Sequence, residues 1–105
     1  AVGAALLTEK GDIITGCNIE NVSYGLTNCA ERTAIFKMVS EKGAVKIKAI
    51  AVATTPDIYA PPCGACRQVM QEFGTSETLI IYKGKKGQYK AIPLKELLPD
   101  PFSSF

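Results

Sequence analysis

Strand-like and helix-like segments follow one another along this chain in the order β-β-α-β-α-β-β-α. Strands are predicted from short apolar or β-branched runs bounded by turn residues, and helices from apolar residues spaced three or four apart. The predicted strands are 2–7, 13–18, 47–54, 78–82 and 89–93, and the predicted helices are 29–41, 63–73 and 94–98. This order predicts the α/β class, as a three-layer α-β-α sandwich around a mixed five-stranded sheet.

Local signals set the boundaries of these elements. The turn at 9–12 makes the first two strands a hairpin. Asn28 is the predicted N-cap of the first long helix, and Gly43 and Gly74 are the predicted ends of the two long helices. Strand 47–54 alternates only weakly, which predicts a central strand that is covered on both faces.

Length and composition limit the class of protein. The chain has 105 residues, 47% of them hydrophobic, which predicts a single ordered domain over residues 1–105. Its apolar runs are far shorter than the roughly 20 residues of a membrane helix, and no signal-type segment precedes them. We therefore expect no membrane partner. Because the chain enters an apolar run directly at Ala1, we also expect residues to be missing before it.

Net charge and the absence of histidine limit the binding partners and the proton-transfer groups that this chain can use. Twelve basic and ten acidic residues give a net charge of +2, without the basic stripe of a nucleic-acid partner. Four lysines gather near two glycines, which indicates a solvated hairpin tip, with a polyanion-binding patch as the alternative: Lys83, Lys85, Lys86 and Lys90. With no histidine in the chain, proton transfer at neutral pH needs a carboxylate, Lys, Tyr or metal-activated water.

Three of the four cysteines fall at predicted helix starts. Cys63 and Cys66 are three residues apart in one first turn, and Cys29 begins the other long helix. The partial positive charge of a helix N-terminus favours thiolates over thiols. Three thiolates would bind Zn²⁺ tetrahedrally and leave a fourth position for water, which is the arrangement of a catalytic site.

Charged residues follow each cysteine motif. Glu31 lies two residues after Cys29 and is the candidate catalytic proton shuttle. Three thiolates on one zinc ion leave a net negative charge, so we expect a cation to compensate it. Arg32 and Arg67 directly follow the two motifs and are predicted to donate hydrogen bonds to thiolate sulfurs.

Two structural alternatives stay open for the cysteines. They are buried structural thiols, or a closed four-cysteine zinc site that includes Cys17 and belongs to a non-enzymatic binding module. Cys17 itself is predicted to be a small buried strand residue. Asn18 and Glu20 share one face at the end of the second strand, opposite to Cys17, and their alternative role is that of turn residues.

Five segments together resemble the small cytidine deaminases along essentially the whole chain. They are VGAALL from Val2, GCNIEN from Gly16, CAERTA from Cys29, PCGACRQ from Pro62 and ELLPDPF from Glu96. The resemblance implies a cytidine deaminase-like fold and zinc-dependent hydrolytic deamination of cytidine and 2′-deoxycytidine in pyrimidine salvage. It also implies one Zn²⁺ per subunit and a cytoplasmic homotetramer. Family members carry a further N-terminal segment with a helix, which this sequence lacks.

The resemblance also implies roles for individual residues. Cys29, Cys63 and Cys66 match the zinc ligands, and Glu31 matches the catalytic carboxylate. The implied substrate-binding residues are Asn18, Glu20, Tyr24, Ala30 and Phe102. Asn18 and Glu20 would hold the ribose 3′-hydroxyl, whereas Tyr24 and Phe102 would reach a neighbouring subunit's nucleoside or serve as ordinary interface or core aromatics. The nearest enzymatic alternative is a deaminase of a modified cytosine nucleoside, of the blasticidin S type, and the Asn18 and Glu20 pair favours plain cytidine.

Overall fold

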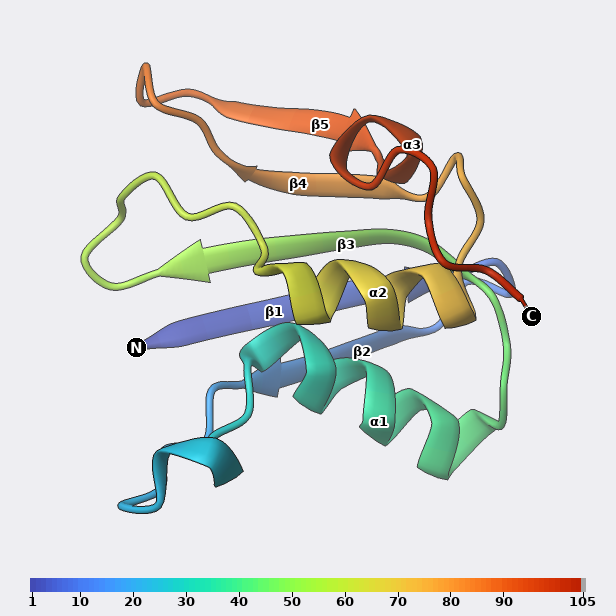
Figure 1. Ribbon diagram of the computed structural model, residues 1–105, viewed down its shortest axis with the longest axis horizontal. Coiled ribbons are helices and arrows are strands. Elements are labelled where there is room, and N and C mark those ends of the chain that lie inside the picture. The colour runs from blue at the N-terminus through green and yellow to red at the C-terminus, as the bar shows by residue number, and fades with distance from the viewer. Residues whose placement is uncertain (105) are drawn as a thin grey trace.

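The computed structural model describes residues 1–104, which form a single five-stranded sheet with helices (Figure 1). The strands are β1 (Val2–Thr8), β2 (Ile13–Cys17), β3 (Ile47–Thr54), β4 (Leu79–Lys83) and β5 (Tyr89–Pro93). The helices are α1 (Ala30–Lys42), α2 (Gly64–Phe73) and α3 (Leu94–Leu97), with a short 3₁₀ helix, η1 (Tyr24–Leu26). In the described part of the chain, no helix is long and apolar enough to cross a membrane.

The sheet has the order β2-β1-β3-β4-β5. β1 pairs antiparallel with both β2 and β3, β3 pairs parallel with β4, and β4 and β5 form an antiparallel hairpin. The predicted α/β class with a mixed five-stranded sheet is therefore confirmed. Residues 1–104 place their helices on one face of the sheet, so they form two of the three predicted layers. The one parallel pairing is connected through α2, as parallel strands require a long crossover.

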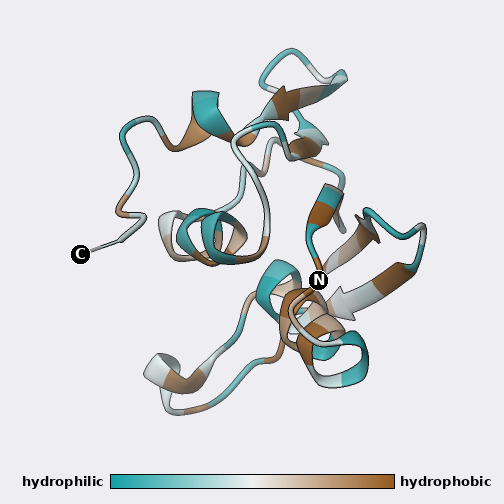
Figure 2. Ribbon diagram, turned by 90° about the vertical axis from the view of Figure 1, so that its right-hand side faces the viewer, coloured by the Kyte–Doolittle hydropathy of each residue, from teal (hydrophilic) through white to brown (hydrophobic). Residues whose placement is uncertain are grey.

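The core lies between the sheet and the helices, which gather on one of its faces (Figure 2). Alternate strand residues such as Leu6, Ile50 and Ile80 are fully buried and point toward the helices. From α1, Ile35 and Met38 are likewise fully buried. These contacts fix α1 and α2 side by side on the sheet, with their N-termini near one another (Figure 1).

The opposite face of the sheet differs from two predictions. β3 was predicted to be covered on both faces, yet Ala51 is only half-buried and Ala53 is exposed. Cys17 was predicted to be buried, and it is exposed. All three residues lie on the sheet face opposite the helices, and residues 1–104 place no helix there to cover them. The weak alternation of β3 thus reflects small apolar alanines and not a second covering layer.

The start of α1 also differs from its prediction. Its N-cap is Cys29 and not Asn28. Asn28 is instead held as a β-bridge, because its backbone exchanges two hydrogen bonds of 2.9 Å with Ile19. The helix ends at Gly43, whose φ of 78° is a conformation that glycine adopts without steric cost. α2 ends at Gly74, as predicted.

Gly16 allows α1 to pack directly on β2. A Cβ atom at this position would lie 2.5 Å from the backbone nitrogen of Ala34 and 2.7 Å from the carbonyl oxygen of Ala30. Both distances are too short for non-bonded atoms, so any side chain here would push the helix away. Gly16 therefore sets the position of the first turns of α1.

Candidate active site

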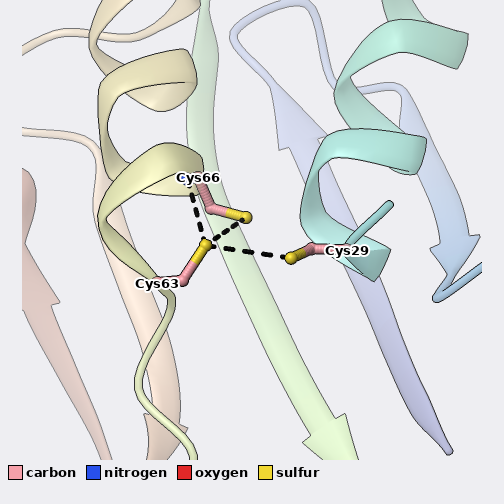
Figure 3. A group of neighbouring side chains, drawn as sticks. All are labelled: Cys29, Cys63 and Cys66. Atoms are coloured by element: carbon pink, nitrogen blue, oxygen red, sulfur yellow. Dashed lines mark hydrogen bonds between the residues drawn. The ribbon is translucent and has the colours of Figure 1, made fainter. Parts of the chain in front are cut away.

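Three cysteine side chains meet where α1 and α2 begin (Figure 3). The Sγ atom of Cys63 lies 3.8 Å from that of Cys29 and 3.4 Å from that of Cys66. All three sulfurs lie within 4.8 Å of one another. Thiolates at the corners of a zinc tetrahedron are about 3.8 Å apart, given Zn–S bonds of about 2.3 Å. The cluster therefore has the donor type and the spacing that zinc requires, and Cys17 is not part of it.

The environment of the cluster favours unequal protonation when no cation is bound. Burial raises the pKa of the Cys63 thiol, but hydrogen bonds from the backbone amide and the thiol of Cys66, and from Cys29, outweigh burial and lower it. Burial raises the pKa of Cys66 far above its ordinary value, and the carboxylate of Glu31 adds to this. Full deprotonation of all three thiols is thus unfavourable in this site without a cation. A bound divalent cation would stabilise the three thiolates.

Arg32 supplies part of the compensating charge. Its Nη2 atom donates to Cys29 Sγ at 3.4 Å, and this contact raises the pKa of the guanidinium. The Nε atom of the same side chain is buried without a hydrogen-bond partner among residues 1–104. The guanidinium is therefore held beside the cluster by the sulfur contact and not by a carboxylate.

Arg67 does not act as predicted. Its Nε atom donates to the carbonyl oxygen of Pro62 at 2.8 Å, and its Nη1 atom donates to that of Leu97 at 2.9 Å. Although Arg67 follows Cys66 directly, its side chain lies between the carbonyl of Pro62, just before α2, and the carbonyl of Leu97, at the end of α3, and donates to both. The predicted donation to a thiolate is therefore wrong. Arg67 instead joins the backbone just before Cys63 to the C-terminal part of the chain.

A pocket of about 300 Å³ opens beside the cysteine cluster. Its walls include most of the predicted site residues, namely Asn18, Glu20, Cys29, Ala30, Glu31 and Cys63. Glu31 is only 5% exposed, so its carboxylate lies in a largely dehydrated environment beside the sulfurs. Ala30 is fully buried at the first position of α1. A small ligand in this pocket would contact both the cysteine cluster and a buried carboxylate.

Asn18 and Glu20 form a hydrogen-bonded pair on the pocket wall. Asn18 Oδ1 accepts from the backbone nitrogen of Val2 at 2.8 Å, which fixes its amide against β1. Its Nδ2 atom donates to Glu20 Oε1 at 2.7 Å. The other carboxylate oxygen of Glu20 makes no hydrogen bond to the described part of the chain. That oxygen remains an acceptor for a hydroxyl group.

Tyr24 and Phe102 lie elsewhere. Tyr24, in η1, is 85% exposed, and Phe102 is 60% exposed. Neither is among the described residues that line the pocket of their own chain. Their predicted contact with a neighbouring subunit's nucleoside stays a prediction.

Comparison with protein families identifies the family to which these site residues belong. Residues 1–82 match the family described as the cytidine and deoxycytidylate deaminase zinc-binding region. The chain belongs to this family. The matched segment contains the complete cysteine cluster together with Glu31 and Asn18. Membership in a zinc-binding family agrees with the donor set and spacing of the three sulfurs.

Individual deaminases are similar over nearly the whole chain. The cytidine deaminase of Halalkalibacterium halodurans is 52% identical over 98% of this chain and 77% of its own length. A probable cytidine deaminase of Dictyostelium discoideum is 52% identical over 97% of this chain and 68% of its own. The crystal structure of cytidine deaminase from Mycobacterium tuberculosis superposes with a TM-score of 0.83 at 44% identity. It covers 96% of this chain and 77% of the other.

Sequence reasoning missed one wall of this deaminase pocket. Ala60 and Pro61 line it from the loop between β3 and α2. Their place just before the PCGAC motif is a signal that they lie near the cysteines. Gly16 was also missed as a packing residue, and only the close approach of α1 reveals it.

Proposed function

We propose that this chain catalyses the zinc-dependent hydrolytic deamination of cytidine and 2′-deoxycytidine to uridine and 2′-deoxyuridine, with release of ammonia. The observation that carries the proposal is a single pocket lined by two cysteines of the three-cysteine cluster, by the buried Glu31 and by the Asn18–Glu20 pair. Membership in the deaminase family and the cytidine deaminases at 44–52% identity support the same reaction.

Cys29, Cys63 and Cys66 would hold one zinc ion per chain. When it is bound, zinc supplies Lewis-acid activation of the water molecule that attacks the pyrimidine. The all-sulfur donor set suits zinc, and three protein ligands leave one position open. The guanidinium of Arg32 offsets part of the negative charge of the thiolates.

Glu31 is the proposed acid and base. Its carboxylate accepts a proton from the attacking water and delivers that proton to N3 as the C4–O bond forms. It then takes the remaining proton from the oxygen now bonded to C4 and passes it to the exocyclic amine, which leaves as ammonia as the C4–N bond breaks and the C4 carbonyl forms. Glu31 suits this role because it is buried beside Cys66 but is not one of the three cysteine ligands, and because the chain has no histidine.

The Asn18–Glu20 pair is the proposed binding site for the ribose 3′-hydroxyl. The Asn18 amide occupies Oε1 of Glu20, which leaves Oε2 to accept a hydrogen bond from the sugar. Glu20 is exposed in this chain, so a substrate without the hydroxyl would lose the hydrogen bond to a charged acceptor and would not leave a buried charge unpaired. The pair thus selects a nucleoside over the free base.

We also propose a cytoplasmic homotetramer with sites completed by neighbouring subunits. Apolar and aromatic side chains are highly exposed in and beside η1, including Val22 at 99% and Tyr24 at 85%. Burying such a patch against another subunit would be favourable. Ligand cysteines that remain free thiols suit a reducing compartment. Size-exclusion chromatography with light scattering tests the assembly, and a fully active monomer would contradict it.

The reaction itself is tested by following the absorbance of cytidine with the zinc-loaded protein. We expect conversion to uridine, loss of conversion after zinc is removed by a chelator, and recovery when zinc is returned. A protein that holds one zinc ion per chain and converts neither cytidine nor 2′-deoxycytidine would contradict the proposal.

A further inference from the structure

The loop between β3 and α2, residues 55–62, forms one wall of the pocket and leads directly to Cys63. In Figure 1 this loop projects beyond the end of β3, on the same side as the tip of the β4–β5 hairpin. The backbone of Thr55 exchanges hydrogen bonds with Ala1, but the loop belongs to no strand or helix, and sheet or helix hydrogen bonds do not hold residues 56–62. Whatever fixes the loop also fixes the pocket wall at Ala60 and Pro61.

Asp57 fastens this loop to the hairpin. Its Oδ2 atom accepts from Lys83 Nζ at 2.8 Å, and its Oδ1 atom accepts from the hydroxyl of Tyr89 at 2.9 Å. Lys83 Nζ also donates to the backbone carbonyl oxygen of Asp57 at 3.2 Å. Both carboxylate oxygens are therefore engaged, and the backbone of the loop is held as well.

The two donors, Lys83 and Tyr89, are held by the β4–β5 hairpin. Lys83 ends β4 and Tyr89 begins β5, and the two residues are paired directly across the hairpin. Their spacing is set by the sheet, so a carboxylate that bridges them has one well-defined position. Lys83 and Tyr89 also lower the pKa of Asp57, which is therefore ionised at neutral pH. We refer to Asp57, Lys83 and Tyr89 as the clasp.

A second attachment lies at the other end of the wall. Arg67 Nε donates to the carbonyl oxygen of Pro62 at 2.8 Å. Residues 58–61 thus lie between two attachment points, the clasp at Asp57 and the Arg67 contact at Pro62. Within this span, the backbone nitrogen of Ile58 donates to Thr54 Oγ1 at 3.2 Å, on the side of the clasp. Two further contacts hold the loop on this side: Thr54 Oγ1 donates to the carbonyl oxygen of Pro56 at 2.7 Å, and Lys85 Nζ lies 5.5 Å from the centroid of the Tyr59 ring. Losing the clasp would therefore loosen the span without releasing it.

We infer that the clasp is a positioning device that holds Ala60 and Pro61 against the bound nucleoside. Asp57 is a positioning residue, since it is among neither the residues that line the pocket nor the cysteine cluster. This inference rests on the proposed cytidine deaminase function. Because the clasp acts on the wall of the pocket and not on Glu31 or the cysteines, it sets the affinity for substrate more than the rate of the chemical step.

Asp57→Asn removes the charge and keeps the shape of the side chain. We expect KM for cytidine to rise about three- to tenfold, the scale of one or two lost contacts to an exposed charged group. We expect kcat and the zinc content to stay unchanged. Tyr89→Phe removes one of the same contacts and should shift KM in the same direction by a smaller factor.

The chain offers a matched control in Glu77. Its Oε1 atom accepts from Lys95 Nζ at 2.9 Å, so it forms an exposed ion pair of the same type, away from the pocket. Glu77→Gln should leave KM unchanged. A general effect of removing a surface ion pair would instead appear in both variants.

Hydrogen exchange gives a second readout that does not depend on activity. In the zinc-loaded protein without nucleoside, the backbone amides of Ile58, Tyr59 and Ala60 should exchange faster in Asp57→Asn than in the parent, and at the parent rate in Glu77→Gln. Equal exchange in all three proteins would overturn the inference, and so would faster exchange with an unchanged KM. If the parent itself fails to deaminate cytidine, the proposed function fails, while the exchange comparison still decides whether the clasp holds the loop.

Discussion

The amide of Asn18 and the carboxylate of Glu20 lie 2.7 Å apart, and the amide is itself anchored to the backbone of Val2. Two residues just past the end of β2 are thereby linked into one polar unit on the pocket wall. This arrangement orients a carboxylate without neutralising it, since an amide is an uncharged donor. A carboxylate fixed in this way can discriminate between sugars that differ by one hydroxyl group.

Glu20→Gln should weaken the binding of cytidine. We expect kcat/KM to fall about 10- to 100-fold, because a hydrogen bond to a charged acceptor contributes roughly 1.5–3 kcal/mol. With 3′-deoxycytidine, the parent and the variant should be similarly poor. The comparison of both proteins on both substrates measures this coupling, and an equal loss on the two substrates would contradict a role in binding the 3′-hydroxyl.

The cysteines should divide into two groups in metal analysis. Replacing Cys29, Cys63 or Cys66 by Ser should abolish stoichiometric zinc, because each sulfur is one corner of the cluster. Cys17→Ser should retain one zinc ion per chain, because this residue is exposed and lies outside the cluster. Zinc loss from Cys17→Ser would favour the closed four-cysteine site instead.

The two arginines should have separable effects. Arg32→Gln removes the donor to Cys29 Sγ, and we expect turnover at neutral pH to fall about 10- to 100-fold, the usual scale for residues that contact metal ligands. Arg67→Gln leaves that contact intact but frees the carbonyls of Pro62 and Leu97, so it should lower the Tm and, through the pocket wall before Pro62, raise KM, with little change in kcat. Thermal melts and kinetics of both variants test this, and identical profiles would refute the distinction.

Gly16→Ala should destabilise the fold and displace the start of α1. The added methyl group would clash with the backbone of the helix at 2.5–2.7 Å, and we expect a loss of about 1–3 kcal/mol in the free energy of unfolding. Gly3→Ala is the matched control, since a Cβ atom there meets nothing within 4 Å. Denaturant melts of both variants give the comparison, and equal stabilities would show that α1 adapts without cost.

Features that depend only on neighbouring residues in the sequence could be predicted well. The strands agree with the structure to within one residue because turn residues bound short β-rich runs. The cysteine cluster was predicted because Cys63 and Cys66 share one helical turn and Cys29 begins the other long helix. These inferences needed only spacing and the known shape of a helix.

Features that depend on distant partners were not predictable in the same way. Asn28 is a residue type that favours the N-cap position, but its backbone forms a β-bridge with Ile19 instead. The alternation of β2 separates its two faces, yet it does not say that Cys17 lies on the uncovered one. Arg67 was predicted to donate to a thiolate, but it donates to the carbonyl oxygen of Leu97, which is 30 residues away in the sequence. The clasp likewise joins Asp57 to a residue 26 positions later in the chain.

The central claim is that the thiolate cluster and the Glu31 carboxylate form one reaction centre. Its most direct test is the rate of cytidine deamination by Glu31→Gln and by the parent, compared at equal zinc content. We expect the variant to fold and bind zinc as the parent does, with turnover lower by at least about 10³-fold, because the same group moves protons in more than one step. A variant that keeps a substantial part of the parent's turnover would contradict the account.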